Sequence, residues 1–135
     1  MPSSISELDG LGPGFAMKLK KVGIRTTEKL LETAKSVKGR RMLAEKTEID
    51  QEQLLRVVNH IDRMRIRGVG QEYSELLEAA GVVTVKALRY RNPARLAQAM
   101  AEANMKRKLV HVLPSEQTIE RWIDYAKQLP VKISY

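Results

Sequence analysis

Apolar residues recur along the chain at helical spacing, three or four positions apart, and no stretch alternates as a strand would. One stripe follows Asp50 and predicts an amphipathic helix; it consists of Leu54, Val57, Val58, Ile61 and Met64. A second stripe follows Ser115 and predicts a similar helix near the C-terminus; it consists of Ile119, Trp122, Ile123, Ala126 and Leu129. The pattern therefore predicts an all-α protein.

Capping residues set the ends of the remaining helices. Pro13 suits the first position of a helix, and Gly23 suits its C-terminal end. Thr26 or Thr27 can cap the next helix, which should run to about Ser36. The C-terminal segment 130–135 begins with proline and is expected to be a short extended tail.

The chain repeats itself at a fixed offset of 58 residues. The matched pairs are Gly10 with Gly68, Gly12 with Gly70, Phe15 with Tyr73, Leu19 with Leu77, Gly23 with Gly81, Thr26 with Thr84, and Leu30 with Leu88. Further along, 49–55 matches 113–119 at an offset of 64, which places six extra residues near 104–111. The repeat predicts two units, 1–65 and 66–135. Because no Gly/Ser/Pro-rich linker separates them, we expect the units to pack as one compact body.

Each unit begins with a glycine-rich turn that leads into a helix. Glycine permits a positive φ and lets a ligand approach the backbone closely. The first N–H groups of the helix then point outward together with the positive end of its dipole. This arrangement is a phosphate site in other proteins. Leu11 and Val69 are expected to be the apolar plugs that fix the two turns to the core.

Two segments carry a resemblance to the helix-hairpin-helix superfamily. The stretch 8–19 fits the hairpin pattern well and 66–77 fits it less fully, with about 23 similar residues in each copy. The tandem arrangement also resembles a bacterial family of small tandem helix-hairpin-helix proteins of unassigned function. The stretch 37–50, which retains Gly39, resembles a degenerate hairpin. The resemblance implies about four helices per unit and paired hairpins that hold the DNA backbone across a minor groove without reading sequence.

Composition and charge favour an anionic partner. The 135 residues carry a formal net charge of +8, with net +5 in 1–67 (14 Lys/Arg, 9 Asp/Glu) and net +3 in 68–135 (10 and 7). A positive charge spread over both units suits a broad contact with a nucleic-acid backbone better than a base-reading pocket. We therefore expect nonspecific binding of double-stranded DNA. RNA is a third candidate partner, after a protein.

The candidate nucleic-acid-binding residues are residues of the two glycine-rich turns and basic side chains. They are Gly10, Leu11, Gly12, Gly14, Lys18, Lys20, Lys21, Arg40, Arg41, Arg65, Arg67, Gly68 and Gly70. The first hairpin is expected to be the better phosphate site. In the second, Glu72 stands where the first has Gly14, and Glu75 and Glu78 follow on the same helix, where carboxylates repel phosphate.

A second interpretation uses the same fold as a protein-interaction scaffold, with turn glycines that only shape the backbone; the acidic second hairpin favours it. The sequence predicts no enzyme, no cofactor and no metal site, because His60 and His111 lack ligand partners at metal spacing and no catalytic motif occurs. There is no cysteine, no apolar run long enough for a membrane span and no signal-peptide pattern. These features suggest a cytoplasmic protein.

Overall fold

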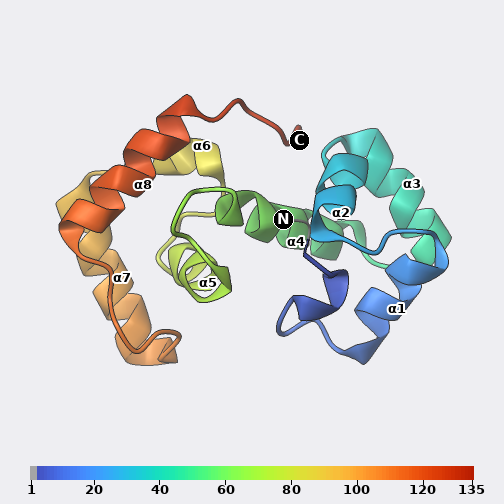
Figure 1. The fold of residues 1–135 in the computed structure, drawn as a ribbon, viewed down its shortest axis with the longest axis horizontal. Helices are drawn as coiled ribbons and strands as arrows, with labels where there is room; N and C mark the ends of the chain where they lie inside the picture. Colours follow the sequence, from blue (N-terminus) through green and yellow to red (C-terminus); the bar gives the residue numbers. More distant parts are fainter. Residues whose placement is uncertain (1–2) are drawn as a thin grey trace. The chain divides into compact units, whose positions relative to one another are not determined.

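The protein is all-α, as predicted. A computed structural model describes residues 3–135, and within them one short 3-10 helix precedes eight α-helices (Figure 1). The elements are η1 (Ile5–Glu7), α1 (Pro13–Lys21), α2 (Thr27–Ala34), α3 (Val37–Thr47), α4 (Gln51–Met64), α5 (Gln71–Ala79), α6 (Val85–Leu88), α7 (Pro93–Arg107) and α8 (Glu116–Gln128). Within 3–135 the β structure is one isolated antiparallel bridge, between Ser4 and Thr26.

The chain forms two compact units. The first contains the residues up to Ile61 together with Lys132–Tyr135, and the second contains Asp62–Val131. The division thus falls inside α4 and returns the tail to the first unit, whereas the predicted boundary lies between 65 and 66. Local contacts explain both differences: Arg63 binds groups of α5, and the tail is bonded to α2. The expected packing of the two units as one body stays a prediction.

Backbone geometry repeats at the 58-residue offset where α1 and α5 end. Gly23 and Gly81 take positive φ angles of 88° and 95°. The next residue in each copy donates back into the helix, Ile24 N to Leu19 O at 3.0 Å and Val82 N to Leu77 O at 2.8 Å. The side chains of Thr26 and Thr84 then cap α2 and α6. The two segments therefore use the same helix ending and the same helix start, while the duplication of the whole unit stays a prediction.

The element before the first glycine turn is shorter than the hairpin motif implies. In the part of the chain that the structure describes, the three-residue η1 precedes Gly10, whereas the 14-residue α4 precedes Gly68. The backbone bonds of the N-terminal segment go instead to the loop before α2, with Ile5 N donating to Arg25 O and Thr27 N to Ser3 O, both at 2.9 Å. Because those groups are engaged outside the segment, it cannot continue as a helix.

The stretch proposed as a degenerate hairpin, 37–50, forms α3 and the loop after it, and it follows a tight turn between α2 and α3. Lys35 and Ser36 form the turn, and Ser36 accepts a hydrogen bond from Gly39 N at 3.0 Å. Gly39 therefore lies in the first turn of α3 and not in the connecting loop. A Cβ on Gly39 would stand 1.9 Å from the carbonyl oxygen of Thr33, so the glycine allows α2 and α3 to approach closely.

The C-terminal tail packs within the first unit around Arg40. The Arg40 side chain is 5% exposed and donates to Ala34 O at 3.0 Å and to Ser134 O at 2.6 Å. Ser134 N donates to Lys35 O at 2.9 Å, and the Tyr135 hydroxyl donates to Asn59 Oδ1 at 2.8 Å. Burial lowers the pKa of the Arg40 guanidinium, and the nearby Tyr135 offsets part of this decrease in pKa. The extended tail is therefore an integral part of the first unit.

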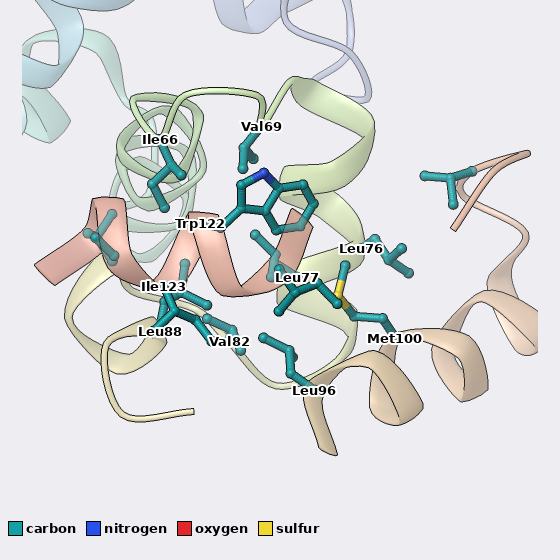
Figure 2. Packing of buried hydrophobic residues seen from close by; sticks show 14 residues of the cluster. Ile66, Val69, Leu76, Leu77, Val82, Leu88, Leu96, Met100, Trp122 and Ile123 are labelled. Atoms are coloured by element: carbon teal, nitrogen blue, oxygen red, sulfur yellow. The ribbon is translucent and has the colours of Figure 1, made fainter. Parts of the chain in front are cut away.

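The second unit encloses a core of aliphatic residues and one tryptophan. Leu76, Leu77, Leu88, Leu96 and Met100 are fully buried in it, together with Trp122 (Figure 2). The two predicted stripes are confirmed, since every member is buried except Met64 and Leu129, which are half-buried. No helix within residues 3–135 has both the length and the apolar character needed to cross a membrane.

Replacing Gly39 with alanine tests the close approach of α2 and α3. The added methyl group would collide with the Thr33 carbonyl, and such overpacking costs about 1–3 kcal/mol. Urea denaturation followed by circular dichroism should therefore show Gly39→Ala to be less stable than the wild type. The matched control is Gly14→Ala, also within a helix but with open space around its Cβ position, where higher helix propensity predicts a gain of about 0.5–1 kcal/mol. Equal effects of the two substitutions would contradict the contact.

Candidate nucleic-acid interface

The first glycine turn is open to solvent and left-handed at two positions. Gly10 and Gly12 have φ angles of 76° and 79°, and both are exposed. Ideal Cβ atoms on Gly10, Gly12 and Gly14 would meet nothing within 4 Å. The backbone of this turn, which we call the first hairpin (Gly10–Gly14), is therefore accessible to a large ligand.

The helices that follow the two glycine turns begin without a side-chain cap. Gly12 and Gly70 occupy the N-cap positions of α1 and α5 and provide no side-chain oxygen for the first N–H groups. In the other six α-helices of the described chain, a side-chain oxygen accepts a backbone N–H in the first turn; these oxygens belong to Thr26, Ser36, Asp50, Thr84, Asn92 and Ser115. Uncapped starts are thus confined to the two hairpins. Such N–H groups can bind an anion.

Basic side chains around the first hairpin differ in their exposure to solvent and in their hydrogen bonding. Lys18 and Lys21 are exposed on α1, while Lys20 is half-buried and donates to the Ser6 hydroxyl. Leu11 is half-buried, so it plugs the turn less completely than expected. Lys18 and Leu11 therefore belong to the accessible part of the hairpin, and Lys20 is tied to η1.

The structure brings acid to the first hairpin that the sequence did not indicate. A groove of about 380 Å³ lies beside α1, and we call it the first groove. Gly14 and Lys18 line it together with Glu48 and Asp50, which belong to the loop between α3 and α4. Glu48 reaches this place because it takes a left-handed conformation, φ 60°, at the end of α3. The first groove therefore holds both signs of charge.

The second glycine turn, which we call the second hairpin (Gly68–Gly70), differs in its backbone. Gly68 has a positive φ of 93°, like its partner Gly10, but Gly70 has an extended φ of −89°, unlike Gly12. Val69 is 4% exposed and acts as the expected plug. The two hairpins therefore share one left-handed glycine and the uncapped helix start, and not the whole loop conformation.

Only one of the two arginines before the second hairpin is available to a ligand. Arg65 Nη1 donates to Asp62 Oδ1 at 2.7 Å, and its side chain is 25% exposed. Arg67 is exposed, and no ion pair joins it to any carboxylate within 3–135. Arg67 is therefore the cation that the second hairpin offers.

Buried Arg63 forms an ion pair with Glu78, one of the acids expected to repel phosphate at the second hairpin. The Arg63 side chain is 1% exposed, and its Nη2 lies 3.7 Å from Glu78 Oε2. Its Nε donates to the carbonyl and the hydroxyl oxygen of Ser74, and its Nη1 donates to Val83 O at 2.7 Å. Glu78 is thus part of the internal structure, and exposed Glu72 remains as the acid in the first turn of α5.

Arginines that lie close together in the sequence differ in their burial. Arg40, a candidate DNA contact, is buried against backbone carbonyls and is removed from the candidate surface, whereas Arg41 next to it is exposed. Arg89 is half-buried and donates through Nε to Ala126 O at 2.9 Å and through Nη2 to Leu129 O, which holds the end of α8. Neighbouring arginines in one cluster therefore have different roles.

A second groove, in the second unit, contains residues that sequence reasoning did not select. It has a volume of about 420 Å³ and lies between the second hairpin, α5 and α8. Arg67 and Gly68 line it from the hairpin, and Thr118, Arg121 and Tyr125 from α8. Their spacing of three to four residues is the available sequence signal, because it places them on neighbouring positions of one helix face.

Comparison with known proteins places the chain in one family. The family described as "Domain of unknown function (DUF4332)" matches residues 9–129, and the chain belongs to that family. No curated protein and no solved structure matches the chain. Within the described residues, no group of three or more His, Asp or Glu side chains is placed to hold a metal ion.

Replacing Arg63 with leucine tests whether the second hairpin depends on the buried guanidinium. The change removes the hydrogen bonds of Arg63 to the Ser74 and Val83 carbonyls and its ion pair with Glu78, which costs about 3 kcal/mol. Urea denaturation should show this loss in the free energy of unfolding. Arg67→Leu is the control, because an exposed arginine four residues away should change stability by less than about 0.5 kcal/mol. If Arg63→Leu matched the control, the proposed anchor would be wrong.

Proposed function

We propose that this member of the family is a non-enzymatic, helix-hairpin-helix DNA-binding protein. It contacts the phosphate backbone of double-stranded DNA without reading sequence, through the first-turn amides of α1 and α5. Lys18, Lys21 and Arg67 add positive charge beside these amides. The observation on which the proposal depends is that the uncapped helix starts of the described chain are those that follow the two glycine turns.

The helix-hairpin-helix assignment is supported most directly by the second copy. There, a 14-residue helix, a turn with left-handed Gly68 and a nine-residue helix follow one another. Val69 N donates to Ile66 O at 3.0 Å and closes the turn, while the Val69 side chain is buried. The first copy contributes the same left-handed glycine at Gly10, after the shorter η1.

The charges near the two hairpins favour phosphate by different means. At the second hairpin, Arg63 forms an ion pair with Glu78, and Glu72 remains as the exposed acid in the first turn of α5. At the first hairpin, Lys18 and Lys21 are exposed, but Glu48 and Asp50 also line the first groove. The sequence-based ranking, in which the first hairpin is the stronger site, therefore loses its electrostatic basis. We assign both hairpins to the DNA contact.

A protein-interaction scaffold is the second candidate function. It is favoured by the first groove, which Lys18 lines together with Glu48 and Asp50, because mixed charge complements another protein better than a uniformly anionic backbone. Met17, one residue before Lys18, is 60% exposed and offers an apolar contact. This candidate predicts a stoichiometric protein complex that DNA does not displace.

Titration of a fluorescent random-sequence duplex at several salt concentrations tests the DNA proposal. The wild type should bind with an affinity that falls steeply as salt rises, because binding releases counterions. Lys18→Glu together with Lys21→Glu should weaken binding and lower the salt slope by about two, since each phosphate contact contributes about 0.9. Fluorescence anisotropy measures both quantities.

The matched control is Lys29→Glu together with Lys46→Glu, which makes the same charge change on exposed positions of α2 and α3 that do not line the first groove. This control should lose less affinity than the hairpin variant. Absence of binding at low salt would contradict the DNA proposal. Equal losses in the two double variants would show that net charge, and not the first hairpin, holds the DNA.

A further inference from the structure

The second groove combines aromatic walls with cationic side chains. Tyr73 of α5 and Tyr125 of α8 are half-buried and line it, and Arg67 and Arg121 line it from the second hairpin and from α8. Its volume of about 420 Å³ lies in the range of small-ligand sites. A backbone phosphate alone needs neither the aromatic walls nor this volume. The groove therefore fits a ligand that has an anionic group and a flat apolar part.

Trp122 places a hydrogen-bond donor at the inner side of this groove. Its side chain is only 2% exposed, and its ring lies 5.3 Å from the ring of Tyr73 at an angle of 54°. Figure 2 shows Val69 of the second hairpin beside the indole. Trp122 Nε1 has no hydrogen-bond acceptor among residues 3–135, and it is not sealed from solvent either. A donor that reaches solvent and has no acceptor in the protein can form a hydrogen bond with a ligand.

Gly68 keeps the indole N–H accessible. A Cβ on Gly68 would stand 3.2 Å from Trp122 Nε1, so any larger residue would cover this atom. The glycine and the tryptophan line the same groove. The second hairpin therefore opens the groove at the point where the donor lies.

Both arginines line the second groove without an acidic partner. Arg121 Nη2 is bonded to Thr118 Oγ1 at 3.2 Å, and that hydroxyl is itself bonded to Ser115 Oγ at 3.0 Å. No carboxylate within 3–135 forms an ion pair with Arg121 or Arg67. The groove is thus cationic, unlike the first groove with its Glu48 and Asp50.

We infer that the second groove binds one unpaired nucleotide. Arg67, Arg121 and the indole N–H take the phosphate, and the half-buried rings of Tyr73 and Tyr125 meet the base. The inference rests on the proposed function, since the second hairpin would hold the adjoining duplex. We therefore expect a duplex with a single-stranded end to bind more tightly than a blunt duplex of the same length.

Trp122 provides the measurement, because it is the only tryptophan of the chain. A 5′-phosphorylated thymidine tetranucleotide should change the tryptophan fluorescence of the full chain, and the change should saturate as the tetranucleotide is added. The tryptophan is excited at a wavelength that thymine does not absorb. Arg67→Gln with Arg121→Gln should weaken this binding at least tenfold. Arg95→Gln with Lys127→Gln removes two exposed charges from the same unit outside the groove and should leave the affinity within twofold.

Three results would overturn the inference: an unsaturable or absent fluorescence change, equal affinities of the two double variants, or tighter binding of an Asp/Glu-rich tetrapeptide than of the tetranucleotide. In the last case the groove would take an acidic protein segment. A blunt duplex titrated in parallel separates the two claims. If the protein binds the duplex but the tetranucleotide does not change its fluorescence, this inference alone is contradicted. If the tetranucleotide changes the fluorescence but the duplex does not bind, the proposed function alone is contradicted.

Discussion

The guanidinium of Arg63 is the contact on which the second hairpin depends. It is almost completely buried, and its hydrogen bonds and ion pair join the end of α4 to Ser74 and Glu78 of α5 and to Val83 beyond it. A buried cation is costly unless its donors are satisfied, so these groups must keep their positions. The turn with Gly68 and Val69 lies between the elements that Arg63 joins. Its shape therefore follows from a charge inside the unit and not from the glycines alone.

The first unit reaches a similar backbone turn by other means. Its N-terminal segment is bonded to the loop before α2, and Arg40 binds Ala34 O and Ser134 O, which fixes the tail beside α2. The short 3-10 helix η1 precedes Gly10 where a long helix precedes Gly68, yet both glycines have a left-handed conformation. One local requirement, a left-handed glycine before an uncapped helix, is thus supported by two different sets of tertiary contacts.

The features that sequence could predict are the ones set by local chemistry. The stripes of α4 and α8, the caps at Thr26 and Ser115, and the helix ends at Gly23 and Gly81 follow from spacing and residue type. The features that it missed depend on distant neighbours. Arg40 and Arg63 stand close to other basic residues in the sequence, as surface residues often do. Both are buried because carbonyls from other segments accept their hydrogen bonds. In the same way, Glu48 and Asp50 join the first groove only through the fold.

The central claim is that the first-turn amides of α1 and α5 contact phosphate, and backbone amide chemical shifts measured by NMR during titration with a blunt duplex test it most directly. The account predicts the largest changes at Gly14 and Phe15 of α1 and at Glu72 and Tyr73 of α5. The amides of Lys29 and Ala87, already bonded to the capping threonines, should change little. Shifts concentrated at the capped helices, or none at either hairpin, would contradict the account.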